Sequence, residues 1–167
     1  MIVIAFPSKP VRLMLVLPLL LSACAIWPGN KAPAEPTAIR YQAGACFGTC
    51  PQFEYRIDAD GNATFNGQRF TKITGEHPAP GDPATFEHLR GLLASVRPAD
   101  GDRTIGPNDC QRFATDHPGI TVVWEEPAGE RRLTYNTGCR DARYQALRDT
   151  LDEVRQALPV EALTGRP

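Results

Sequence analysis

The sequence predicts an α+β domain with two layers, in which two helices pack on one face of an antiparallel sheet in the order ββββ-α-ββ-α. Most strand-like segments alternate apolar and polar residues, which is typical of strands that bury only one face. Two other segments carry a single apolar stripe at helical spacing. Because strands and helices do not alternate one by one, we do not expect a doubly wound fold. Packing both stripes on one face of the sheet is the economical way to bury them.

Six segments are expected to form strands: residues 39–42, 52–58, 63–65, 69–74, 120–125 and 131–135. In the clearest of them, Phe53, Tyr55 and Ile57 alternate with polar residues. Hairpin turns are predicted at residues 60–61 and 66–67, because glycine accepts the positive φ that a tight turn needs. The first segments therefore predict an antiparallel meander of three or four strands.

The two helices are predicted over residues 82–97 and 141–158. Asp82 can cap the free N–H groups at the start of the first helix, and Pro83 suits the first helical position. A proline follows each helix and is expected to end it.

Between the first helix and the fifth strand lies a polar segment, residues 98–118, that is rich in glycine and proline. Unstructured links of this length are uncommon in compact domains and are often either functional or disordered. Cys110 lies within the segment, which suggests that the segment is pinned. We expect it to be the first place to look for a binding site.

The N-terminal residues are typical of an export signal. Lys9 and Arg12 precede a run of about nine mostly apolar residues, which is too short for a bilayer span of roughly 20 residues but suits a cleavable signal. The segment 21–24, Leu-Ser-Ala-Cys, resembles the lipobox of bacterial lipoproteins. That resemblance implies cleavage before Cys24 and attachment of lipid to its sulfur. Ala25 stands where an aspartate would often retain the protein in the inner membrane, so the expected location is the outer membrane, facing the periplasm of a Gram-negative cell.

The chain is therefore expected to have four parts. These are a signal peptide (1–23), the lipidated Cys24 with a proline-rich tether (24–38), a single α+β domain (39–158) and a tail (159–167). Loss of the signal peptide would reduce the 18 basic residues to 16, against 19 acidic ones. This charge balance lacks the basic footprint of a nucleic-acid-binding protein. The expected contact with a membrane is through the N-terminal lipid.

Four cysteines remain for the folded domain: Cys46, Cys50, Cys110 and Cys139. An even number of cysteines in an exported domain indicates disulfides, and four cysteines permit three pairings. We favour Cys46–Cys50 together with Cys110–Cys139, because Gly48 allows the chain to fold back between the first two. Chain-entropy estimates assign about 2 kcal/mol to the short ring and about 3.6 kcal/mol to the long one.

Other cysteine chemistry has weaker support in the sequence. Thioredoxin-type enzymes use a C-x-x-C motif that opens a helix, whereas three residues separate Cys46 from Cys50 and a strand pattern follows. A zinc site formed by the four cysteines is disfavoured in an oxidising compartment. We assign no catalytic residue, no metal ligand and no cofactor.

The motif Cys46-x-Gly48-x-Cys50-Pro51-x-Phe53, followed by Asp60-Gly61 and Phe65-x-Gly67, resembles the opening of an uncharacterised bacterial domain family. Members of this family, a domain of unknown function, often occur in lipoproteins and other exported proteins. The resemblance extends over residues 39–158 and implies no established activity. Cys110 and Cys139 are additions to its basic pattern, which fits their pairing with each other.

These observations favour a non-enzymatic, lipid-anchored domain that binds a partner, such as an envelope protein or a cell-wall component. One alternative is a periplasmic thiol-redox protein that uses Cys46 and Cys50. Another is a protein that binds a small molecule or a metal through residues 98–118.

Overall fold

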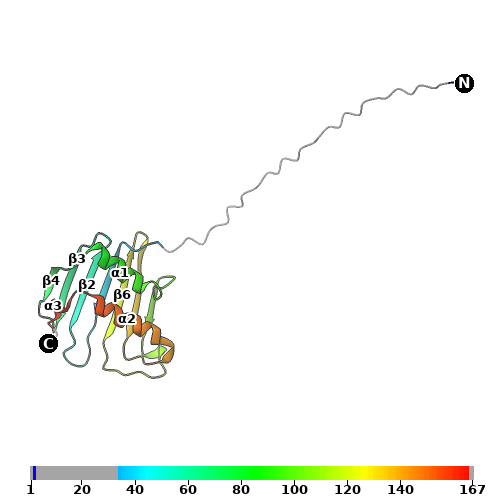
Figure 1. Ribbon diagram of the computed structural model, residues 1–167. Coiled ribbons are helices and arrows are strands. Elements are labelled where there is room, and N and C mark those ends of the chain that lie inside the picture. Colours follow the sequence, from blue (N-terminus) through cyan, green and yellow to red (C-terminus); the bar gives the residue numbers. More distant parts are fainter. Residues whose placement is uncertain (1, 3–33, 166–167) are drawn as a thin grey trace. The chain divides into compact units, whose positions relative to one another are not determined.

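The computed structural model describes residue 2 and residues 34–165. Its centre is a seven-stranded sheet with the order β4-β3-β2-β1-β6-β7-β5 (Figure 1). The strands are β1 (Ala38–Ala43), β2 (Gln52–Asp58), β3 (Ala63–Arg69), β4 (Gly75–Ala79), β5 (Asp102–Ile105), β6 (Gly119–Glu126) and β7 (Gly129–Asn136). The mixed α and β composition predicted from the sequence is confirmed.

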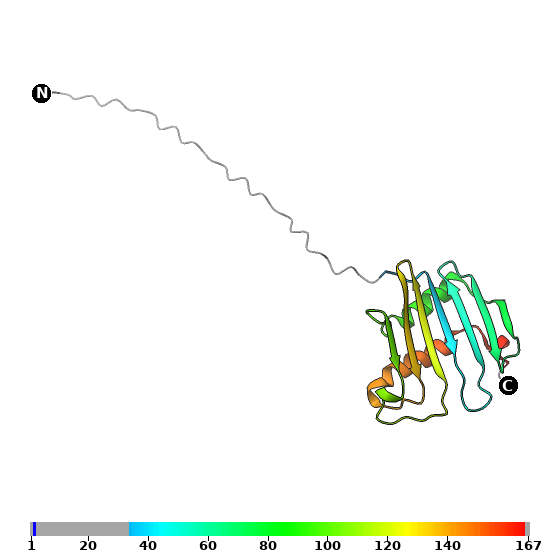
Figure 2. The same ribbon diagram turned by 180° about the vertical axis from the view of Figure 1, so that it is seen from behind.

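Helices α1 (Pro83–Leu93) and α2 (Gln145–Ala157) both lie on one face of the sheet, as the two opposite views in Figures 1 and 2 show. Two short 3-10 helices, η1 (Pro107–Asp109) and η2 (Ala142–Tyr144), precede β6 and α2. A third helix, α3 (Glu161–Thr164), falls within the segment assigned to the tail and was not predicted.

The period-two pattern of the strands places their apolar side chains on the face that the helices cover. Tyr41, Tyr55 and Phe65 are each at most 1% exposed and form one core with the apolar stripes of α1 and α2. The opposite face is polar. There Glu125 accepts hydrogen bonds from Arg56 and forms an ion pair with Arg40 at 3.1 Å. These contacts, led by the hydrogen bond from Arg56, lower the pKa of Glu125.

The start of α1 is formed as the sequence predicts. The Asp82 carboxylate accepts a 2.6 Å hydrogen bond from the backbone N–H of Thr85, and Pro83 is the first helical residue. The helix ends at Leu93, four residues before the predicted end. Beyond it, Arg97 pairs with the largely buried carboxylate of Glu126, which is also 2.8 Å from Arg131. This cluster joins the end of α1 to the β6–β7 hairpin.

The predicted strand over residues 69–74 is wrong, and so is the hairpin turn at residues 66–67. Strand β3 continues through Gly67, and the next strand begins only at Gly75. Gly67 is needed inside the strand because a Cβ there would lie 1.9 Å from the carbonyl oxygen of Ile73. The chain leaves β3 at Phe70, which adopts a φ of 55°. The glycine therefore permits a close crossing of the chain, not a tight turn.

The sheet is also not wholly antiparallel, which corrects a second part of the prediction. Strand β5 lies within the segment 98–118 and pairs in parallel with β7 at the edge of the sheet. Only Ile105 of its four residues is buried, so the segment lacks the alternation that identifies a strand.

Both favoured disulfides are present. The Cα atoms of Cys46 and Cys50 are 5.8 Å apart, and those of Cys110 and Cys139 are 5.7 Å apart. The first bridge closes an exposed loop, whereas Cys139 is completely buried.

Apart from residue 2, the predicted signal peptide lies outside the described residues, as do Cys24 and most of the tether. Within the part of the chain that the structure describes, no helix is long and apolar enough to cross a membrane.

The two disulfides should differ in their effect on stability. We expect the double variant Cys110→Ala/Cys139→Ala to lose about 3.6 kcal/mol of unfolding free energy and Cys46→Ala/Cys50→Ala about 2 kcal/mol, because the longer loop restricts the unfolded chain more. Urea denaturation followed by circular dichroism measures both losses. An equal or larger loss from opening the short loop would contradict this expectation.

Candidate functional site

A cleft of about 610 Å³ lies between α2 and the ends of the four central strands β2, β1, β6 and β7. Its floor is formed by core side chains, among them Tyr41, Phe53, Ile120 and Tyr135. Ligand sites in proteins have a similar size and a similar mixture of apolar walls with a few polar groups. The cleft is therefore the candidate site.

One wall of the cleft is a single face of α2. The lining residues Arg148, Leu151, Asp152, Arg155 and Gln156 recur at intervals of three and four residues. Leu151 also belongs to the apolar stripe that packs on the sheet, so the wall is apolar at its base and polar at its rim. At the rim, Arg155 Nε lies 3.7 Å from a carboxylate oxygen of Asp152.

The opposite wall combines the cysteine loop with the residues that lead into β6. Cys50 and Pro51 line it on one side, and His117 and Pro118 on the other. The N–H of Gly44 donates a 2.8 Å hydrogen bond to the carbonyl of Gly119, and a Cβ on Gly44 would lie 3.0 Å from that oxygen. The absence of a side chain at residue 44 thus lets the two segments approach each other.

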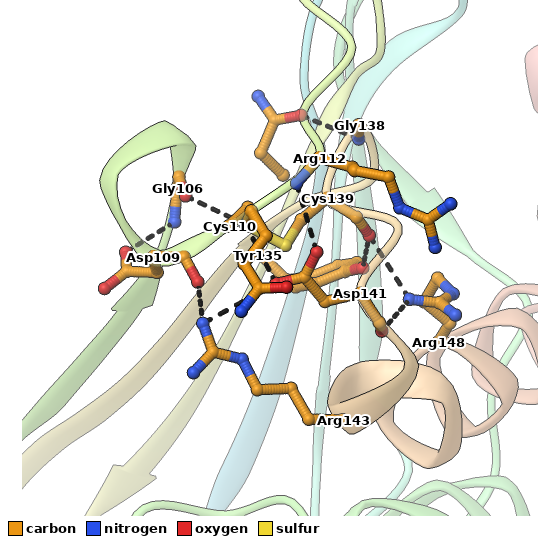
Figure 3. Close-up of a disulfide and its surroundings, with 12 residues drawn as sticks. Gly106, Asp109, Cys110, Arg112, Tyr135, Gly138, Cys139, Asp141, Arg143 and Arg148 are labelled. Carbon is orange, nitrogen blue, oxygen red and sulfur yellow. Dashed lines mark hydrogen bonds and ion pairs between the residues drawn. A yellow bond between two sulfur atoms is a disulfide. The ribbon is translucent and has the colours of Figure 1, made fainter.

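The corner of the cleft next to α2 is held by the Cys110–Cys139 disulfide and the carboxylate of Asp141 (Figure 3). Asp141 accepts hydrogen bonds from the backbone N–H groups of Gln111 and Arg112, at 3.0 and 3.2 Å. These hydrogen bonds, first that from Gln111, lower the pKa of Asp141 despite its desolvation, and the nearby guanidinium groups act in the same direction.

Arg148 is fixed at this corner. Its Nη1 donates to the carbonyl oxygens of Cys139 and Asp141, at 3.3 and 3.0 Å, so that its guanidinium lies against the turn before α2 (Figure 3). The hydroxyl of Tyr135 donates to the same carbonyl of Cys139. The next residue, Arg140, is exposed and lines the cleft, and its side chain makes no hydrogen bond or ion pair with the described residues. The guanidinium of Arg148 is therefore held by the protein, whereas that of Arg140 is available to a ligand.

The candidate cleft lies largely outside the segment 98–118, where the sequence led us to look first for a binding site. Of the segment 98–118, only His117 and Pro118 line the cleft. Cys50 lines it, whereas Cys46 lies on a shallower hollow around the loop tip. The described residues contain no group of three or more His, Cys, Asp or Glu side chains arranged to hold a metal ion.

Sequence reasoning missed the three cleft arginines, Arg140, Arg148 and Arg155. The only signal was the polar face of α2 beside its apolar stripe, with Arg148, Asp152 and Arg155 at helical spacing. A polar helix face usually faces solvent, so this pattern alone does not indicate a site.

The comparison with known families gives a match over most of the chain. A family model described as Domain of unknown function (DUF6438) matches residues 37–158. The chain belongs to this family. The DUF6438 match extends from the start of β1 to the end of α2 and so contains most of the cleft. The lining residues Val160, Glu161 and Thr164, at or in α3, follow the DUF6438 domain. No curated protein matches the chain.

The hydrogen bonds to Asp141 should make stability depend on acid pH. Because folding lowers its pKa below the ordinary value of 3.8, the ionised carboxylate stabilises the fold above pH 3.8, and this contribution is lost as the pH falls through the lower pKa of the folded state. We expect Asp141→Asn to be less stable than the wild type at neutral pH, with a difference that shrinks below pH 3.8.

Denaturation midpoints measured across this pH range test the expectation. Asp149→Asn, on the exposed face of α2, is the matched control and should follow the wild type throughout. A difference between Asp141→Asn and the wild type that stays constant with pH would contradict the role assigned to the carboxylate.

Proposed function

We propose that the chain is a lipid-anchored protein of the cell envelope whose DUF6438 domain binds a ligand or a partner segment in the cleft. The observation that carries this proposal is the cleft itself, about 610 Å³ in volume, with an apolar floor and arginines at its rim. Such a combination of apolar walls and a few charged groups is typical of ligand sites.

Arginine is the most frequent charged residue of the cleft, and this favours the binding of an anion. Three of its charged side chains, Arg140, Arg148 and Arg155, are guanidinium groups. A guanidinium remains protonated at any physiological pH and donates hydrogen bonds without exchanging protons, so it suits the recognition of an anion better than general acid–base chemistry.

The proposed location rests on the lipobox-like segment 21–24 and on the two disulfides. Disulfides persist in oxidising compartments such as the periplasm. A lipid on Cys24 would hold the domain near the outer membrane through a tether that ends at residue 38, where β1 begins.

Lipid attachment has a direct test. Cells that produce the protein are supplied with an alkyne-bearing palmitate, and the label on the purified protein is measured by gel fluorescence. We expect the wild type and Cys46→Ala/Cys50→Ala to carry the label and Cys24→Ser to lose it, because the sulfur of Cys24 is the proposed attachment site. Equal labelling of Cys24→Ser and the wild type would refute lipidation at this residue.

Occupation of the cleft can be tested in cells with a photo-crosslinking residue. Gln156 is exposed and lines the cleft, whereas Glu153 is exposed on α2 outside it. We expect p-benzoylphenylalanine at position 156, but not at position 153, to give a covalent adduct that mass spectrometry detects after illumination. No adduct at either position, or equal adducts at both, would overturn the proposal.

A further inference from the structure

The cleft has two arginines at one end and a carboxylate at the other, with the Arg155–Asp152 pair between them. Arg140 and Arg148 lie where β7 leads into α2, and Arg148 Nη1 is 3.3 Å from the carbonyl of the residue before Arg140. At the other end, Glu161 begins α3, which hydrogen-bonds to residues that follow β3. Strands β7 and β3 are four places apart in the sheet, a separation of about 19 Å at the usual spacing of strands.

The cationic end offers hydrogen-bond donors in a fixed arrangement. Two nitrogens of Arg148 are held by the carbonyls of Cys139 and Asp141 and by Gln145. This anchoring places the guanidinium before a ligand arrives and reduces the entropic cost of binding. Arg140 has no side-chain partner among the described residues and can close on the same group. Arg148 keeps two of its five N–H donors, the one on Nε and one on Nη2, and together with the guanidinium of Arg140 these suit the two oxygens of a carboxylate.

The cleft is apolar between its two ends. Phe53, Ile120, Leu151 and Leu158 line it, and each is buried in the core. From Arg148 to Leu158 the helix rises about 15 Å, which sets the length of the apolar wall. Arg155, farther along the rim, already has Asp152 as an ion-pair partner, and Glu161 repels a second negative charge. The cleft therefore has room for the apolar part of a ligand, and its cationic end can bind one anionic group.

From this arrangement we propose that the ligand is an amphipathic carboxylate with its head group on Arg140 and Arg148 and its apolar body along α2 toward α3. The proposal rests on the proposed function and names the class of ligand that the cleft selects. The cleft differs from a peptide-binding groove. Its one cationic corner and long apolar floor match a ligand with a single anionic head group and an apolar tail.

Photolabelling with a defined amphiphile tests the proposal. The full chain in phospholipid nanodiscs is illuminated with dodecanoate that carries a diazirine on its chain, and the labelled peptides are identified by mass spectrometry. We expect labels on α2 and on residues 117–120, with saturation that unlabelled dodecanoate competes away. The neutral analogue dodecanamide, which has the same chain and shape, should label these peptides at least about tenfold more weakly, because it lacks the charge-assisted hydrogen bonds.

Variants of Arg140 separate the carboxylate contact from simple partitioning into lipid. Arg140→Gln should raise the half-saturating concentration about tenfold, and Arg140→Lys, which keeps the charge but loses the bidentate geometry, should fall between it and the wild type. Arg103→Gln is the control, because Arg103 is an exposed arginine on β5 outside the cleft. The side chain of Arg140 is exposed and makes no hydrogen bond or ion pair with the described residues, so we expect its replacement to leave the fold intact.

The outcomes distinguish the ligand class from the function of the cleft. Equal labelling by dodecanoate and dodecanamide, labels outside the cleft, or no effect of Arg140→Gln would overturn the amphipathic carboxylate. If that result were accompanied by an adduct at position 156 in cells, the cleft would still be a binding site for another class of ligand. If both experiments failed, the proposed function would fall as well.

Discussion

The arrangement of the cleft depends on one buried corner, where the Cys110–Cys139 bridge and the carboxylate of Asp141 join three segments of the chain. The segment before β6, the end of β7 and the turn into α2 come together there. The covalent bond sets their spacing, and Asp141 accepts hydrogen bonds from the backbone N–H groups of Gln111 and Arg112. Arg148 then donates to the carbonyls on the other side of the same turn.

From this corner, α2 crosses the sheet and is held again at its far end. There Leu163 of α3 accepts hydrogen bonds from the N–H groups of Lys72 and Ile73. Between the two ends, Leu151 and Val154 pack on the sheet, and the neighbouring face of the helix borders the cleft. A helix attached at both ends and in the middle keeps its distance from the cysteine loop, and this distance is the width of the cleft. The Cys110–Cys139 disulfide therefore supports the cleft through the position of α2.

The sequence predicted those parts of the fold in which a local pattern and the tertiary structure agree. Strand β2 was predicted with its observed bounds, because Phe53, Tyr55 and Ile57 alternate and are all buried. The start of α1 was predicted because Asp82 and Pro83 act within one turn. Strand β5 was missed, since a short edge strand with one buried residue carries no alternation.

The cleft was harder to predict than the fold, and for a different reason. The cleft is formed by segments that are far apart in the sequence. Two of its lining residues, Arg140 and Arg148, look in the sequence like ordinary charged residues near the start of a helix. Their proposed role depends on the turn beside the second disulfide, where both residues line the cleft. The cysteines could be assigned from their number and spacing, but the consequence of their pairing for the neighbouring arginines requires the structure.

Helix α3 has only four residues and lies beyond the DUF6438 domain, yet Glu161 and Thr164 line the cleft. The end of the cleft is thus formed by a short segment outside the matched domain. A substitution of Glu161, which is exposed, would change the charge at this end of the cleft without removing the hydrogen bonds that join Leu163 to the residues after β3. Under the proposed function, the length of the ligand and the strength of its attachment are therefore set by different segments, α3 and the corner beside α2.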